Sequence, residues 1–147
     1  MREVDKPLSL IDAINKCIPD PRNPFFTVHQ QRTMLAQRIL GIALGYQDLN
    51  DHQSLRDDRL FQIVTERGGV TKDDSPLSSP PTLCRLENRI DRKALTDISS
   101  VFVETFISFF TNPTEKLVLG FAATDDSVHG NQDKRFFHGY YDSCCFL

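Results

Sequence analysis

The apolar pattern of this chain changes its period once, near residue 112, and that change most constrains the fold. Apolar residues recur at helical intervals from Ala94 to Phe110, which predicts a long helix with one buried face. Asn112-Pro113 then stops the helix, and Leu117-Val118-Leu119 is continuously apolar, as in a strand covered on both sides. A second strand is predicted at Phe136-Phe137. Helices followed by strands make the chain α+β.

Three further helices are predicted before residue 70. The first contains the apolar residues between 8 and 18 and ends at Pro19-Asp20-Pro21, because proline cannot continue a helix. The second runs over 28–44 and is broken at Gly45. The third begins at Ser54 as the N-cap, continues to Val64 and is closed by Gly68-Gly69.

Residues 71–81 hold three prolines and three serines, a composition that predicts a linker without a packed element. Thr82 follows as the expected N-cap of the next helix. The predicted organisation is a helical region at 1–70, a linker at 71–81, helices at 82–112, and a strand-containing domain at 113–147.

Charge and cysteine content narrow the class of protein. The formal net charge of −3 leaves the question of a nucleic-acid partner open, because such proteins often confine positive charge to one face. The four cysteines form no CxxC pair, which favours reduced thiols in a cytoplasmic protein. No apolar run approaches the roughly 18 residues that indicate a membrane span.

Acidic residues stand where the predicted strand ends. Asp125 and Asp126 follow the apolar run, and carboxylates delivered by a rigid strand are typical ligands of divalent ions in phosphoryl-transfer enzymes. The alternative is that both are solvated turn residues that hydrogen-bond locally.

Several motifs, in one order along the chain, carry a family resemblance. They are RILGIALGYQDLNDH at 38–52, LRDD at 55–58, TLCRLEN at 82–88, ATDDSVHG at 123–130 and FFHGYYD at 136–142. Together they resemble the amino-terminal part of a DDE-type insertion-sequence transposase. The resemblance implies an amino-terminal helical region followed by the first one or two strands of an incomplete RNase-H-like sheet.

The resemblance also implies an activity. Such enzymes cut and rejoin DNA ends, and two aspartates and a glutamate hold divalent ions, usually Mg²⁺. In the family pattern the first two aspartate positions correspond to Gly120 and Ala122 here, and the second of them, at Ala122, is the expected metal-ligand position. The remaining ligands correspond to positions beyond Leu147. Asp125 and Asp126 lie roughly 10 Å further along an extended chain than the family's ligand position. We therefore expect a truncated, inactive chain without a bound metal.

DNA, in particular transposon ends, is the partner that the resemblance implies. The candidate contacts are the basic residues of the helical regions, Arg32, Arg38, Arg56, Arg59, Arg85 and Arg89. The alternative is that these arginines form ordinary solvated helix faces paired with nearby acids. A second functional hypothesis is a non-catalytic helical module that binds DNA or associates with a full-length transposase.

Two other groups have competing readings. His129, His138, Cys144 and Cys145 are potential zinc donors, but their spacing is better explained by strand and turn roles. Adjacent cysteines on a strand point to opposite faces. The phenylalanines at 102, 106, 109 and 110 are predicted core residues rather than a base-stacking platform.

Overall fold

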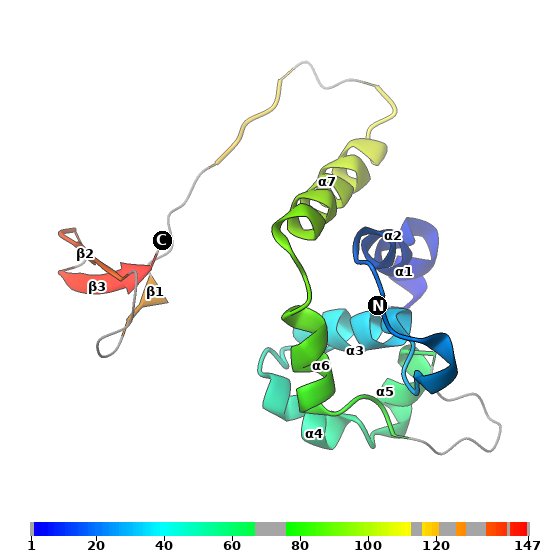
Figure 1. The fold of residues 1–147 in the computed structure, drawn as a ribbon. Coiled ribbons are helices and arrows are strands. Elements are labelled where there is room, and N and C mark those ends of the chain that lie inside the picture. Colours follow the sequence, from blue (N-terminus) through cyan, green and yellow to red (C-terminus); the bar gives the residue numbers. More distant parts are fainter. Residues whose placement is uncertain are drawn as a thin grey trace. The chain divides into compact units, whose positions relative to one another are not determined.

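A computed structural model describes residues 2–66, 76–112, 116–120, 126–128, 135–140 and 142–146. The chain forms two compact units, residues 1–111 and 112–147. The first contains helices α1 to α7 and the second contains strands β1 to β3, so the chain is α+β as predicted (Figure 1).

The first elements of unit 1 include the two helices predicted around residues 8–18 and 28–44, preceded by a helix that the sequence pattern does not indicate. They are α1 (Arg2–Leu8), α2 (Leu10–Cys17), a 3-10 turn η1 (Pro24–Phe26) and α3 (Gln31–Ala43). Gly45 ends α3 with a φ of 95°, and the Tyr46 N–H donates to the Gly41 carbonyl at 2.9 Å. This left-handed glycine with a bond back into the last turn is a Schellman ending, so the predicted break at Gly45 is confirmed.

The predicted third helix is wrong as a single element. The structure has a 3-10 turn η2 (Leu49–Asp51), α4 (His52–Leu55) and α5 (Arg59–Val64). Asp58 separates the two helices, because its carboxylate accepts from the Phe61 N–H at 2.7 Å and so caps a new helix. Ser54 lies inside α4 instead, and the Gly68-Gly69 pair lies outside the described residues.

The expectation that 71–81 contains no packed element is wrong for its described part. Leu77 and Ser78 are fully buried, and α6 (Pro80–Glu87) begins with two prolines after the N-cap Ser79, not at Thr82. Proline suits the first turn because its missing N–H has no helical partner there. Residues 71–75 lie outside the described part of the chain.

The described residues of unit 1 form two buried apolar clusters. The larger joins α2, α3, α6 and the start of α7 through Ile11, Ile14, Ile18, Met34, Leu35, Ala36, Leu83, Leu86 and Ala94. The smaller consists of Leu40, Phe61 and Leu77, with Leu55 and Val64 against it. The segment before α6 therefore closes the second cluster by burying Leu77.

Helix α7 (Arg92–Ser108) confirms the predicted long helix but not the predicted burial of its phenylalanines. Ala94 is buried, and Ile98 and Val101 pack against the larger cluster. Phe102 and Phe106 in its second half are exposed, and so are Phe109 and Phe110, which follow its last residue. The 17 residues of α7 extend about 25 Å, whereas the 8 residues of its neighbour α2 extend about 12 Å, so α2 covers only part of α7.

Unit 2 contains a small antiparallel sheet in the order β1-β3-β2, formed by Asp126–Ser127, Phe136–His138 and Ser143–Phe146. The second predicted strand is confirmed as β2. The first is wrong, because residues 116–120 have no regular structure and Leu117, Val118 and Leu119 are 56–80% exposed. An apolar run of three residues gives only a weak strand signal when no neighbouring strand pairs with it.

Candidate nucleic-acid interface

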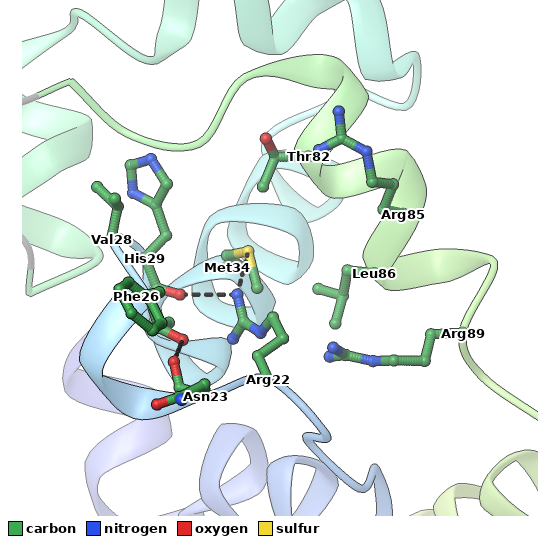
Figure 2. Close-up of a pocket in the computed structure, with 11 residues that line it drawn as sticks. Arg22, Asn23, Phe26, Val28, His29, Met34, Thr82, Arg85, Leu86 and Arg89 are labelled. Atoms are coloured by element: carbon green, nitrogen blue, oxygen red, sulfur yellow. Dashed lines mark hydrogen bonds between the residues drawn. The ribbon is translucent and has the colours of Figure 1, made fainter.

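Unit 1 contains an open cleft of about 580 Å³ between the segment 22–29 and helix α6. Figure 2 shows the two walls facing each other, with Arg85 on α6 and Arg89 just after it on one side, and Phe26, Val28 and His29 opposite. The complete lining is Arg22, Asn23, Phe26, Thr27, Val28, His29, Met34, Thr82, Arg85, Leu86 and Arg89.

Asp20 fixes two of the three arginines. The Arg22 Nε and Nη2 atoms each donate to its carboxylate at 2.7 Å, and Arg89 Nη1 donates to Oδ1 at 3.2 Å. The hydrogen bonds from Arg22 lower the pKa of Asp20 to about 2, so this carboxylate is ionised at neutral pH. The two guanidiniums are therefore held in position before any ligand arrives.

Each of these arginines has a second anchor in the protein. Arg22 Nη1 also donates to the His29 carbonyl at 3.0 Å, and Arg89 Nη2 donates to Gln31 Oε1. The Gln31 amide in turn donates to the Ile18 carbonyl at 2.7 Å. The arrangement ties segment 18–29 to α3 and to the turn after α6, and so holds the two walls of the cleft together.

Arg85 differs from the other two arginines. It lies in the last turn of α6 and is exposed, and within the described residues its guanidinium has no hydrogen bond or ion pair. Three guanidiniums and one carboxylate leave the cleft with positive charge, although the whole chain is acidic. Arg85 is thus the group best placed to bind an anion.

The rim and floor of the cleft are apolar. Phe26 is 85% exposed and Val28 is 72% exposed on one rim, while Met34 and Leu86 are buried at the floor. The 3-10 turn that carries Phe26 is fixed by Asn23, whose side chain accepts from the Phe25 N–H at 3.0 Å. Thr27 Oγ1 donates to the Asn23 carbonyl at 2.8 Å.

The other predicted arginines lie away from this cleft. Arg32 bonds to Asp12 at 2.6 Å and to Glu66 at 2.8 Å, and Arg38 bonds to Glu87 at 2.5 Å and to the Gln47 carbonyl at 2.8 Å. Arg32 and Arg38 therefore match the alternative that the predicted arginines pair with nearby acidic residues. The hydrogen bond from Arg32 lowers the pKa of Asp12.

Two candidates lie near the start of α5. Arg56 follows α4 and is half-buried, whereas Arg59 begins α5 and is exposed. DNA contact by any of the six predicted arginines stays a prediction. Sequence reasoning missed Arg22 and Phe26. The signal that points to them is the segment Asp20-Pro21-Arg22-Asn23-Pro24, where prolines fix the backbone around a basic residue.

Comparison with known protein families shows the family to which the chain belongs. The family model described as "Transposase DDE domain group 1" matches residues 1–147. The chain belongs to this transposase family. No curated protein and no solved structure matched it.

Proteins of the transposase family act on DNA and usually use Mg²⁺, so DNA is the expected class of partner. The family resemblance places its first two aspartates at Gly120 and Ala122 of this chain, and neither of these side chains carries an oxygen. The residues at these two positions therefore do not fit a magnesium ion, which takes oxygen ligands.

The structure describes little of the remaining positions considered for a metal ion. Ala122 and Asp125 lie outside the described residues, and Asp126 is described only through its backbone, which pairs with Phe146. Within the described parts of the chain, no three His, Cys, Asp or Glu side chains come together. Of the potential zinc donors, His129 also lies outside the described residues.

The described cysteines are all reduced. All four cysteines are free thiols, and in β3 Cys145 is buried while Cys144 is only partly so, as expected for neighbours on opposite faces. No described helix is both long enough and apolar enough to cross a membrane.

Proposed function

We propose that this chain acts in DNA transposition as a DNA-binding but non-catalytic member of its family. The observation that carries the proposal is the transposase family match over residues 1–147. The cleft supports the DNA-binding part, because its exposed Arg85 is suited to a phosphate and its fixed arginines add positive charge. The transposon end is the DNA that we expect it to bind.

Replacing Arg85 by alanine should weaken binding to duplex DNA about five- to tenfold at low salt. It should also reduce the slope of log affinity against log salt concentration by about one, as expected for the loss of one phosphate contact. The measurement is fluorescence anisotropy of a labelled duplex over a salt series.

Arg92→Ala is the matched control for Arg85→Ala. Arg92 is exposed at the start of α7 and does not line the cleft, so its loss removes the same charge elsewhere in unit 1. Equal effects of both substitutions on affinity and slope would show that the cleft is not the DNA contact. Failure of the unmodified protein to bind any duplex, the element's own ends included, would remove the proposed function.

The chemistry of positions 120 and 122 supports the non-catalytic part of the proposal. Glycine and alanine supply no ligand oxygen, and loss of a ligand from a two-metal site is severe. Purified protein should therefore leave supercoiled plasmid intact with Mg²⁺ or Mn²⁺. A metal-dependent nick that disappears in the Asp126→Asn variant would instead establish a working site at Asp126.

A second candidate function is association with a full-length transposase. It is favoured by the exposed apolar side chains in the second half of α7, since exposed patches of this kind mark protein contacts. Co-elution with a full-length relative on gel filtration supports this function, and separate elution counts against it.

A further inference from the structure

We propose that the cleft binds an unpaired nucleotide of DNA, with the base against Phe26 and its phosphate at Arg85. This inference rests on the proposed DNA binding and specifies the form of DNA that the cleft prefers. It predicts that a single-stranded extension at a DNA end is bound more tightly than a blunt duplex.

The 3-10 turn at the rim of the cleft presents an exposed aromatic ring. Phe26 is 85% exposed, although burial of an aromatic side chain is strongly favourable. Its turn is held by the Asn23 cap and by Pro24, which restricts the backbone. A ring presented on a fixed turn loses little conformational entropy when a ligand packs against it.

The opposite wall of the cleft is cationic. Across the cleft from Phe26 lie Arg85 on α6 and Arg89 in the turn after it, and the buried Met34 and Leu86 form an apolar floor between the walls (Figure 2). An aromatic rim, an apolar floor and a cationic wall match a nucleotide, which joins a flat base to an anionic phosphate. The volume of about 580 Å³ lies within the usual range for ligand pockets.

Unpaired DNA and duplex DNA differ in whether the face of a base is accessible. In a duplex each base is stacked between its neighbours, so its face is not available to Phe26 unless the stack is opened, which costs free energy. A duplex therefore reaches Arg85 through its phosphates alone. An unpaired nucleotide contacts Arg85 and also stacks on Phe26. The two contacts together make the cleft prefer unpaired DNA to duplex DNA.

The test compares two neighbouring phenylalanines. Phe25 is 93% exposed on the same turn but does not line the cleft, so Phe25→Ala is the matched control for Phe26→Ala. Anisotropy is measured with the full chain on a blunt duplex and on the same duplex with a single-stranded overhang. Circular dichroism checks that each variant is folded.

We expect the overhang duplex to bind more tightly than the blunt one. Phe26→Ala should weaken overhang binding about five- to a hundredfold, the range for loss of one base–aromatic stack, and should leave blunt-duplex binding unchanged. Phe25→Ala should leave both unchanged. A fluorescent base analogue in the overhang should be quenched by the unmodified protein and by Phe25→Ala but not by Phe26→Ala.

Two results overturn this inference while leaving duplex binding intact. One is equal affinity for blunt and overhang DNA with no effect of Phe26→Ala, while Arg85→Ala still weakens binding. The other is an equal loss from Phe25→Ala and Phe26→Ala, which indicates a general apolar contact outside the cleft. Absence of binding to every DNA instead removes the proposed function itself.

Discussion

Replacing Gln37 by leucine should lower the free energy of unfolding of unit 1 by about 2 to 5 kcal/mol. Gln37 is fully buried in α3, and its amide makes two hydrogen bonds to the backbone of Ser78. Its Oε1 accepts from the Ser78 N–H at 3.0 Å and its Nε2 donates to the Ser78 carbonyl at 2.9 Å. Nε2 also lies 3.3 Å from Nδ1 of the buried His52.

Leucine has a similar size but no polar atoms, so the substitution leaves these buried partners without hydrogen bonds. Each orphaned group costs about 1 to 3 kcal/mol of desolvation, partly relieved if the segment moves toward water. Such movement takes Leu77 out of its cluster with Leu40 and Phe61, so relaxation replaces one loss with another. Both routes therefore destabilise the unit.

Urea unfolding followed by circular dichroism measures the effect of Gln37→Leu. Gln53→Leu is the matched control, because Gln53 is exposed in α4 and the same chemical change there should stay within about 0.5 kcal/mol. If Gln37→Leu were as mild as Gln53→Leu, the contact between α3 and the segment before α6 would contribute nothing to stability.

The contact between Gln37 and Ser78 also shows which parts of the fold the sequence can predict. The ends of α2 and α3 depend on Pro19 and Gly45, residues whose backbone preferences act locally. The burial of residues 77–78 depends instead on a glutamine 41 positions earlier. A segment rich in proline and serine resembles a linker until that distant partner is known.

Burial of α7 was overestimated for a related reason. Periodicity shows which side chains share a face of α7, but the length of the neighbouring helix decides how much of that face is covered. In the cleft, Arg85 and Arg89 were identifiable as basic residues. Phe26 was not, because it lies in a short turn without periodicity, and its role depends on facing α6.

Replacing Gly41 by alanine should destabilise unit 1 by about 1 to 2 kcal/mol, against the usual preference of helices for alanine. A Cβ at position 41 lies 2.7 Å from Cε1 and 3.0 Å from Nε2 of His52. The imidazole ring is fully buried against Phe61, so it has little room to move. The overlap costs about 2 to 3 kcal/mol and exceeds the gain of about 1 kcal/mol in helix propensity.

The decisive measurement is a double-mutant cycle with His52→Ala, because the overlap disappears when the imidazole is removed. In that background Gly41→Ala should become stabilising by up to about 1 kcal/mol, so the sign of its effect reverses.

Burial lowers the pKa of His52 below 6.5, so the folded state binds fewer protons than the unfolded state between the two pKa values. The stability that depends on neutral His52 is therefore complete above pH 6.5 and decreases as the pH falls toward the folded-state pKa. Urea unfolding should show this pH dependence in both proteins that retain His52 and not in the two His52→Ala variants.

In the mutant cycle, a Gly41→Ala effect of the same sign in both backgrounds would mean that the ring moves aside and that close packing at Gly41 does not hold α3 against α4.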